Sequence, residues 1–255
     1  MRIRRNSIAS LIAALGPLLL VAASLGTCAQ IPLEEFDMAL SAIPMESHSR
    51  VLGAIESQLG APGFPAEDVL QLIYRLAPIP AMNEDKEAIL LLVARAIERN
   101  LSIGGLVGVS FDLANALEEG LPITEVINEA LKGITQGASI AVIEAGVIQR
   151  LTLLREVRDL LFERGILRAS PGAGYVPETA LAAESFDQIV AEIADTVSDF
   201  LSGGGSPFNA DGLYGLASDR LRWLGETVVP SEDVDRVLEH IGPPDLTRVA
   251  LAAIR

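Results

Sequence analysis

The sequence contains a single cysteine, Cys28, and only two histidines, His48 and His240, among its 255 residues. One cysteine cannot form an intramolecular disulfide, so no disulfide framework is expected. One cysteine and two distant histidines cannot complete a zinc site by themselves, and no phosphate-binding loop appears. Nucleophilic catalysis requires a serine or cysteine beside a positioned base, and both histidines are expected to be structural. The sequence therefore predicts no catalytic residue, no metal site and no cofactor, and the protein is expected not to be an enzyme.

Basic residues are scarce as well: 19 Lys and Arg stand against 34 Asp and Glu, a formal net charge of −15. Nucleic acids and anionic lipid surfaces select clustered Lys and Arg, so neither is an expected partner. Aromatic residues make up only 4% of the chain, and its 14 prolines and 22 glycines are scattered. Hydrophobic residues nevertheless reach 50%, well above the content of a disordered chain, and the length suits one or two domains with a sizeable core.

A long uncharged run extends from Ile8 to Gly26 and follows three arginines within the first five residues. A basic start before an apolar segment is typical of a secretory signal, so residues 1–29 are predicted to be an export signal. The alternative is an uncleaved membrane anchor, since the run is long enough to span a bilayer. Pro17 interrupts the run, which favours a signal peptide. The protein is therefore expected in the periplasm or cell envelope, in contact with the membrane only through its N-terminus.

Cys28 lies directly after this run and is a candidate lipidation site. The sequence Leu25-Gly26-Thr27-Cys28 resembles the lipobox of bacterial lipoproteins, in which the cysteine becomes the lipidated first residue. Thr27 departs from that pattern, which has Gly, Ala or Ser at this position. Ordinary cleavage after Ala29 is the alternative, because Thr27 and Ala29 are small residues that flank the cysteine.

From Gln30 onward the pattern is helical, because Ala, Leu, Ile, Glu and Arg dominate and alternation of the β type is nearly absent. The longest helical run covers about Ala138 to Arg164. The sequence predicts an all-α fold, a multi-helix bundle or a short irregular α-solenoid of about eleven helices with no sheet. Apolar residues recur at i, i+3, i+4 and i+7, which places one face of each helix in a core. Four leucines on these faces are predicted to be buried: Leu72, Leu92, Leu154 and Leu161.

Three segments share the form P-x-x-[DE]-V and begin at Pro65, Pro122 and Pro230, and a weaker relative begins at Pro177. The four prolines are 57, 55 and 53 residues apart. A proline followed by acidic residues is typical of a helix start. Two interpretations stay open: chance spacing of ordinary helix starts, or a helical repeat of about 55 residues, as in an α-solenoid.

Two Gly/Pro-rich stretches, at 169–174 and 203–207, are typical of linkers and divide the chain. The predicted organisation is an export signal at 1–29, a main helical domain at 30–168, a linker at 169–176, a bridging helix at 177–202, a flexible linker at 203–212 and a small helical tail at 213–255.

The only tryptophan lies at the C-terminal end of the chain with two other aromatic residues and two arginines: Phe208, Tyr214, Arg220, Arg222 and Trp223. Aromatic residues with arginine are common anchors of a binding surface, so these five form the candidate interaction surface. The alternative is that the aromatic residues supply the core of a small helical tail.

The segment 120–148 carries a further pattern, at Gly120, Leu121, Pro122, Lys132, Gly133 and Gly137. It resembles exported bacterial proteins that repeat a G-L-P start followed by a K-G-x-x-x-G helix junction. These proteins have no assigned activity. The resemblance covers about a tenth of the chain and implies a helical architecture and no mechanism.

Together these features predict an exported protein of the bacterial envelope that acts as a non-catalytic helical interaction or scaffold module for an envelope protein. The alternative is a helical carrier for an apolar ligand, which the mean hydropathy of +0.39 favours. A hydrolytic enzyme comes third, because the sequence lacks residues with suitable chemistry. An apolar cavity would favour the carrier, and an exposed apolar patch would favour the scaffold.

Overall fold

The computed structural model describes residues 31–170 and 176–254. The predicted export signal with Cys28 and part of the first predicted linker lie outside the described residues. Within them the chain is 72% helical and forms eleven helices, which confirms the predicted all-α class. In chain order the helices are Leu33–Leu40 (α2), His48–Gln58 (α3), Ala66–Leu76 (α4), Asn83–Glu98 (α5), Ile103–Glu118 (α6), Thr124–Gln136 (α7), Ile140–Glu163 (α8), Ala183–Ser202 (α9), Ala210–Thr227 (α10), Ser231–His240 (α11) and Pro243–Ala253 (α12).

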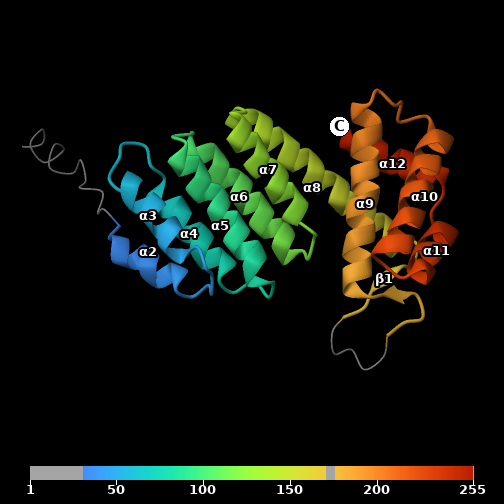
Figure 1. Ribbon diagram of the computed structural model, residues 1–255, viewed down its shortest axis with the longest axis horizontal. Coiled ribbons are helices and arrows are strands. Elements are labelled where there is room, and N and C mark those ends of the chain that lie inside the picture. The colour runs from blue at the N-terminus through green and yellow to red at the C-terminus, as the bar shows by residue number, and fades with distance from the viewer. Residues whose placement is uncertain (1–30, 171–175, 255) are drawn as a thin grey trace, which may run out of the picture.

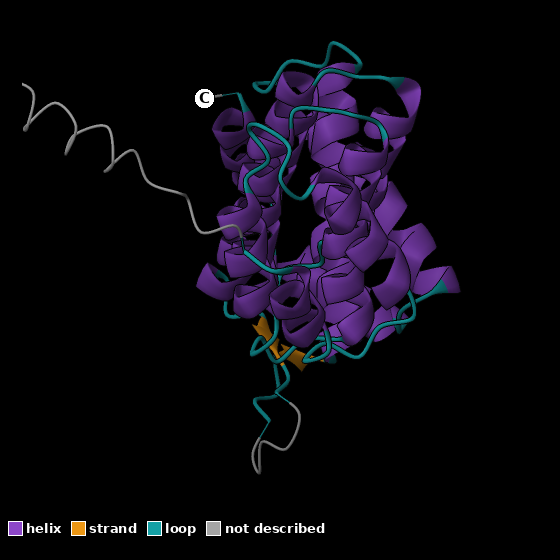
Figure 2. Cartoon of the chain, turned by 90° about the vertical axis from the view of Figure 1, so that its left-hand side faces the viewer, coloured by secondary structure: helices purple, strands orange, loops and turns teal. Residues whose placement is uncertain are grey.

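The expectation of no sheet is wrong in one detail, because Leu167–Arg168 (β1) and Ala180–Leu181 (β2) pair in parallel. The two strands lie near the two ends of the connection from α8 to α9, at one edge of the helical body (Figure 2). The main-chain N–H of Ala169 donates to the carbonyl oxygen of Leu181 at 2.7 Å, so the pair satisfies peptide groups that no helix includes. Strands of two residues are too short to show an alternating pattern, so the sequence did not predict them.

The first seven helices form a stack of two rows (Figure 1). In one row α3, α5 and α7 pack side by side, and in the other α4 packs on α6 and α6 on α8. Helix α2 packs on α3 and α4 at the N-terminal end of the stack. Since α5 also packs on α6 and α7 on α8, the two rows cover each other's apolar faces.

The last four helices form a bundle at the other end of the molecule (Figure 1). Helix α9 corresponds to the predicted bridging helix at 177–202, but it begins only at Ala183, because Ala180–Leu181 form β2 instead. It packs on α8 and also on α10 and α12. Helix α12 returns to α8 as well, and α11 packs on α10. The long helix α8 is therefore the element that belongs to both the helix stack and this C-terminal bundle.

Buried apolar side chains form one continuous core that extends from Phe36 in α2 to Ala250 in α12. The four leucines predicted to be buried are between 0% and 1% exposed, which confirms the helix phases assigned to them. The apolar stripe of α4 is buried along its whole length, from Val69 to Leu76. Burial of these faces, rather than helix propensity, supplies most of the stability of such helices.

The proline spacing does not correspond to a structural repeat. Pro65 precedes α4, whereas Pro122 precedes α7. Helix α4 belongs to the row of α6 and α8, but α7 belongs to the row of α3 and α5, so the two helices do not occupy equivalent places. Gly120, with a φ of 73°, closes α6, because the N–H after it donates to the carbonyl oxygen of Ala116. Pro65, Pro122 and Pro230 lie at or just before helix starts, as the first of the two interpretations held, whereas Pro177 precedes the strand β2, and α9 begins only at Ala183.

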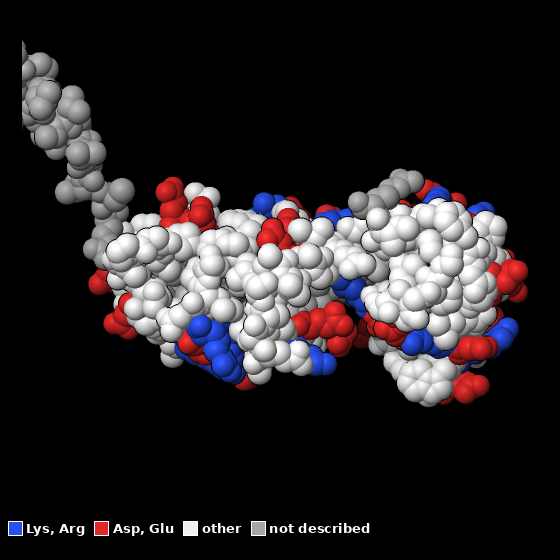
Figure 3. Space-filling view, turned by 90° about the horizontal axis from the view of Figure 1, so that it is seen from above, with Lys and Arg blue, Asp and Glu red and all other residues white. Residues whose placement is uncertain are grey.

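Acidic and basic side chains meet where the stack joins the C-terminal bundle (Figure 3). There the buried Arg150 of α8 pairs with Asp195 of α9. Burial lowers the pKa of Arg150, and the carboxylates of α7 and α9 around it oppose that effect. Just beyond α8, Arg164 pairs with Asp245 of α12. These ion pairs fix the orientation of α9 and α12 relative to α8, in a junction that is otherwise apolar.

Candidate functional site

Trp223 is 59% exposed and lies on a solvent-facing side of α10. Leu216, two turns earlier on the same side, is 36% exposed, and Phe208, just before the helix, is 76% exposed. We define the α10 outer face by the exposed residues at this helical spacing: Gly212, Gly215, Leu216, Asp219, Arg222, Trp223 and Glu226. Its only ion pair among the described residues joins Arg222 to Asp219 at 3.9 Å. The face therefore offers an aromatic anchor beside an arginine on a rigid helix.

The other two residues of the predicted interaction surface serve the packing of the bundle. The Tyr214 hydroxyl is half-buried and donates to the carbonyl oxygen of Leu238 in α11 at 3.4 Å. Arg220 binds Asp199 at 2.7 Å and Glu192 at 3.7 Å, both on α9. The structure thus leaves Phe208, Arg222 and Trp223 exposed, while Tyr214 and Arg220 attach α10 to its neighbours.

The two histidines lie in different parts of the molecule (Figure 1). His48 begins α3, and its Nε2 is 2.8 Å from Oδ1 of Asp37 in α2. His240 ends α11, and its Nδ1 is 2.7 Å from the carbonyl oxygen of Arg236. Each histidine is thus engaged in a local contact that joins neighbouring segments or closes a helix.

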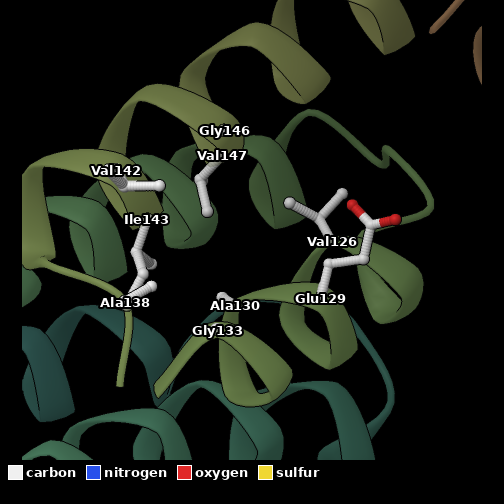
Figure 4. A pocket seen from close by; sticks show the side chains of 9 residues that line it. All are labelled: Val126, Glu129, Ala130, Gly133, Ala138, Val142, Ile143, Gly146 and Val147. Carbon is white, nitrogen blue, oxygen red and sulfur yellow. The ribbon is translucent and has the colours of Figure 1, made fainter. Parts of the chain in front are cut away.

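A small apolar groove lies between α7 and α8 (Figure 4). Val142, Ile143 and Val147 of α8 line one side and Ala130 lies opposite, with the Glu129 carboxylate at the rim. A Cβ at Gly133 would lie 3.2 Å from the Ile143 side chain, so glycine permits the close approach of the two helices. The groove has a volume of about 140 Å³, below the roughly 300–1,000 Å³ of typical small-molecule sites.

A larger concavity of about 790 Å³ lies where the loops beside α5 and α7 meet β1 and the first turns of α9. We call it the polar cleft. Its apolar wall includes Pro80, Met82, Leu121 and Pro122. Its polar lining consists of Asp85, Thr124, Arg168, Glu184, Asp187 and Gln188.

Arg168 and Asp187 form the centre of the polar cleft. The Arg168 guanidinium donates from Nη2 to Oδ2 of Asp187 at 2.9 Å and from Nη1 to the carbonyl oxygen of Gly120 at 3.0 Å. Oδ1 of Asp187 is buried and has no hydrogen-bond partner. Burial raises the pKa of Asp187 to about 6, although the charge of Arg168 lowers it. The cleft therefore holds a carboxyl group whose charge is incompletely compensated.

Asp85 is a second carboxyl group of this kind. Thr124 donates to its Oδ1 at 3.0 Å. Burial raises the pKa of Asp85, the hydrogen bond from Thr124 opposes the shift, and the charge of Glu84 adds to it. The negative charge of Asp85 also raises the pKa of Asp187, so the two carboxyl groups interact. Raised pKa values of neighbouring carboxyl groups in a cleft are a common property of functional sites.

The polar cleft was not predictable from the sequence, because its residues come from segments far apart in the chain. The one local signal was Gly120-Leu121-Pro122, which lines the cleft but was interpreted as a helix start and as part of the resemblance to exported helical proteins. No periodicity or spacing links Asp85, Arg168 and Asp187, and only packing of α9 against the stack brings them together.

Across residues 31–170 and 176–254, no group of three or more His, Cys, Asp or Glu is arranged to hold a metal ion. None of the helices in that part of the chain has the length and apolar character needed to cross a membrane. No protein-family model, curated protein or solved structure matches the chain. The resemblance of the segment 120–148 to exported helical proteins therefore stays a prediction.

Proposed function

We propose that this protein is a non-catalytic interaction module of the bacterial envelope and that it binds a partner protein through the α10 outer face. The observation that carries the proposal is the exposure of Trp223, the only tryptophan of the chain, at 59%. Tryptophan and arginine are enriched among the residues that dominate binding energy, and here Trp223 adjoins Arg222. Burial of Trp223 and Leu216 by a partner would remove apolar surface that water now contacts.

The rest of the α10 outer face supports a flat contact. Gly215 carries no side chain and has open space beside it, so a partner could approach the helix backbone closely next to Leu216. Arg220 and Tyr214 hold α10 against α9 and α11, and this support reduces the conformational entropy that binding would cost.

The location in the envelope rests on the sequence of residues 1–29. A basic start, an apolar run and Cys28 support export, with or without lipid attachment. An exported scaffold would present its helix stack and C-terminal bundle to other envelope proteins, and the N-terminus would make the membrane contact.

Site-specific photo-crosslinking in intact cells tests this function. A crosslinking amino acid at position 223 should capture a discrete envelope protein, and the same residue at position 74 should not. Tyr74 is a matched control, because it is an aromatic residue on a helix and is 51% exposed. With the crosslinking amino acid placed at position 216 instead, the Trp223→Ala substitution should lower the yield of the crosslinked product at least about tenfold. Equal capture from positions 223 and 74, or capture unaffected by Trp223→Ala, would contradict the proposal.

The carrier for an apolar ligand is the second candidate, and the groove between α7 and α8 is the feature that favours it. At about 140 Å³ this groove resembles cavities that hold a single benzene-sized molecule. A fatty acyl chain would not fit. The exposed aromatic residues near α10 therefore favour the interaction module over the carrier.

A further inference from the structure

We propose that the groove between α7 and α8 is the docking site for a basic segment of a partner protein. One phenylalanine side chain of that segment enters the groove, and a neighbouring Lys or Arg lies beside Glu129 and Glu125 of α7. This inference adds a second partner surface to the protein and is independent of the α10 outer face.

The size and the lining of the groove suit one apolar side chain. Its floor consists of apolar residues that are between 2% and 5% exposed: Val126, Ala130, Ile143 and Val147. The volume of about 140 Å³ is close to the roughly 150 Å³ of a cavity that holds benzene, which is the ring of a phenylalanine side chain. A peptide anchor needs no larger site, because the rest of the segment lies across the surface.

The mouth of the groove is accessible to the backbone of a partner. Val142 of α8 is apolar but is 64% exposed. On the same helix, Gly146 borders the groove without a side chain (Figure 4). A Cβ at Gly146 would meet no described side chain or neighbouring helix within 4 Å, so there is room above this glycine. A docked segment can therefore approach α8 closely and remove Val142 from water.

The charges beside the groove favour a basic occupant. The Glu129 carboxylate lies at the rim, and Glu125 is one turn earlier on α7. Neither carboxylate forms an ion pair with any described residue, because the nearby Arg150 is buried and pairs with Asp195 of α9. Lys132 is the single basic residue of α7, so two carboxylates stand against one ammonium group on this helix. The α7 side of the groove therefore attracts cations.

The negative charge continues from the groove toward the C-terminal bundle. Asp195 of α9 pairs with Arg150, and Glu192 and Asp199 of the same helix also act on its guanidinium. Arg220 pairs with both Glu192 and Asp199, so two arginines stand against three carboxylates of α9 at this junction. A basic segment is attracted along the whole path from the groove to the junction, whereas an acidic segment is repelled.

A short synthetic peptide of alanine and lysine with one central phenylalanine is the probe, and calorimetry with the full chain measures its binding. The same peptide with alanine in place of phenylalanine should bind at least about tenfold more weakly, because it lacks the anchor. A peptide with glutamate in place of each lysine should also bind at least about tenfold more weakly. No binding of the first peptide, or equal affinity for it and either altered peptide, would overturn the proposal.

Gly146→Leu tests the groove from the side of the protein. The new side chain has room and would occupy the groove, so the variant should fold like the parent chain and bind the peptide at least about tenfold more weakly. Gly53→Leu is the matched control, because Gly53 is an exposed glycine within α3 and its Cβ also meets nothing within 4 Å. Circular dichroism compares the folding of both variants. Equal peptide affinities of the two variants would show that the segment does not dock in the groove.

Charge reversal tests the basic character of the occupant. Glu129→Lys should weaken peptide binding at least about tenfold, because it replaces an attraction by a repulsion. Glu144→Lys changes the net charge equally but lies outside the groove lining on α8, so it should weaken binding less than about twofold. Equal effects of the two reversals would contradict the role of Glu129. Toluene that binds the groove as tightly as the peptide does would identify a site for a free apolar ligand and would overturn the proposal.

Discussion

The Phe162 ring of α8 lies against the Phe186 ring of α9, with ring centroids 5.6 Å apart and planes tilted by 45°. Phe186 is 3% exposed, whereas Phe162 is 43% exposed. Phe162 lies on α8, which the helix stack and the C-terminal bundle share, and Phe186 lies on α9 of the bundle, so their contact belongs to the junction between these two parts. A junction built on buried apolar side chains holds the two parts in one orientation.

Phe186→Ala should therefore destabilise the whole protein. Loss of a buried phenylalanine side chain costs about 3–5 kcal/mol of the free energy of unfolding, since it leaves a cavity between α8 and α9. Phe208→Ala is the matched control, because Phe208 is 76% exposed and its loss should change stability by less than about 0.5 kcal/mol. Urea unfolding followed by circular dichroism measures both. Similar stabilities of the two variants would contradict the burial assigned to Phe186.

Leu154→Ala tests the interior of α8. Leu154 is 1% exposed and belongs to the continuous core, so its truncation should lower the free energy of unfolding by about 2–5 kcal/mol. Ile148 lies on the same helix and is 46% exposed, so Ile148→Ala should cost much less. Thermal unfolding of the two variants compares a buried and an exposed position in one helix. An unchanged melting temperature for Leu154→Ala would show that the helix phase is wrong.

Asp187 should make the protein more stable as the pH falls. Burial raises its pKa from 3.8 to about 6, so the folded chain binds this proton more tightly than the unfolded chain. Its contribution to the free energy of unfolding should increase as the pH falls through about 6 and should be complete below about 4. The Asp187→Asn variant should lack this increase. Urea unfolding at a series of pH values measures the difference between the two proteins.

Glu119 should show the opposite dependence of stability on pH, because its pKa in the folded chain is lowered. The Glu119→Gln variant is therefore the control for the Asp187→Asn measurement. Hydrogen bonds from Arg155 at 2.9 Å lower the pKa of Glu119. Its contribution is therefore present above the unfolded pKa of 4.5 and is lost as the pH falls through the lower folded value. A difference between parent and Asp187→Asn proteins that stays constant with pH, or that follows the Glu119→Gln pattern, would contradict the assignment.

Cys28 lies outside the described residues, and its chemistry can be tested directly. If Cys28 is lipidated, the protein should partition into the detergent phase, and Cys28→Ser should move it to the soluble fraction. Mass spectrometry of the mature chain distinguishes the alternatives. An unmodified N-terminus at Gln30 would show simple cleavage after Ala29 and would exclude a lipid anchor.

Much of the helical architecture was predictable, because helices depend on short-range patterns. The stripe of α4 and the burial of Leu72 and Leu154 follow from apolar spacing along single helices, and the structure confirms both. The proline motifs were also local: Pro65, Pro122 and Pro230 lie at or just before helix starts, but Pro177 does not, and the spacing marks no larger unit. Short-range patterns determine where a helix begins and which of its faces is apolar.

The tertiary structure alone decided which helices cover which residues. Among the five residues of the predicted surface, Tyr214 is covered by α11 and Arg220 is engaged by α9, whereas Trp223 is exposed. The polar cleft exists only because α9 packs beside the loops of the stack and brings Asp187 to Arg168. The sequence by itself determined the helices and their apolar faces, since these depend on neighbours within a few residues. Exposure and the pKa of Asp187 depend on segments far apart in the chain, so packing had to determine them.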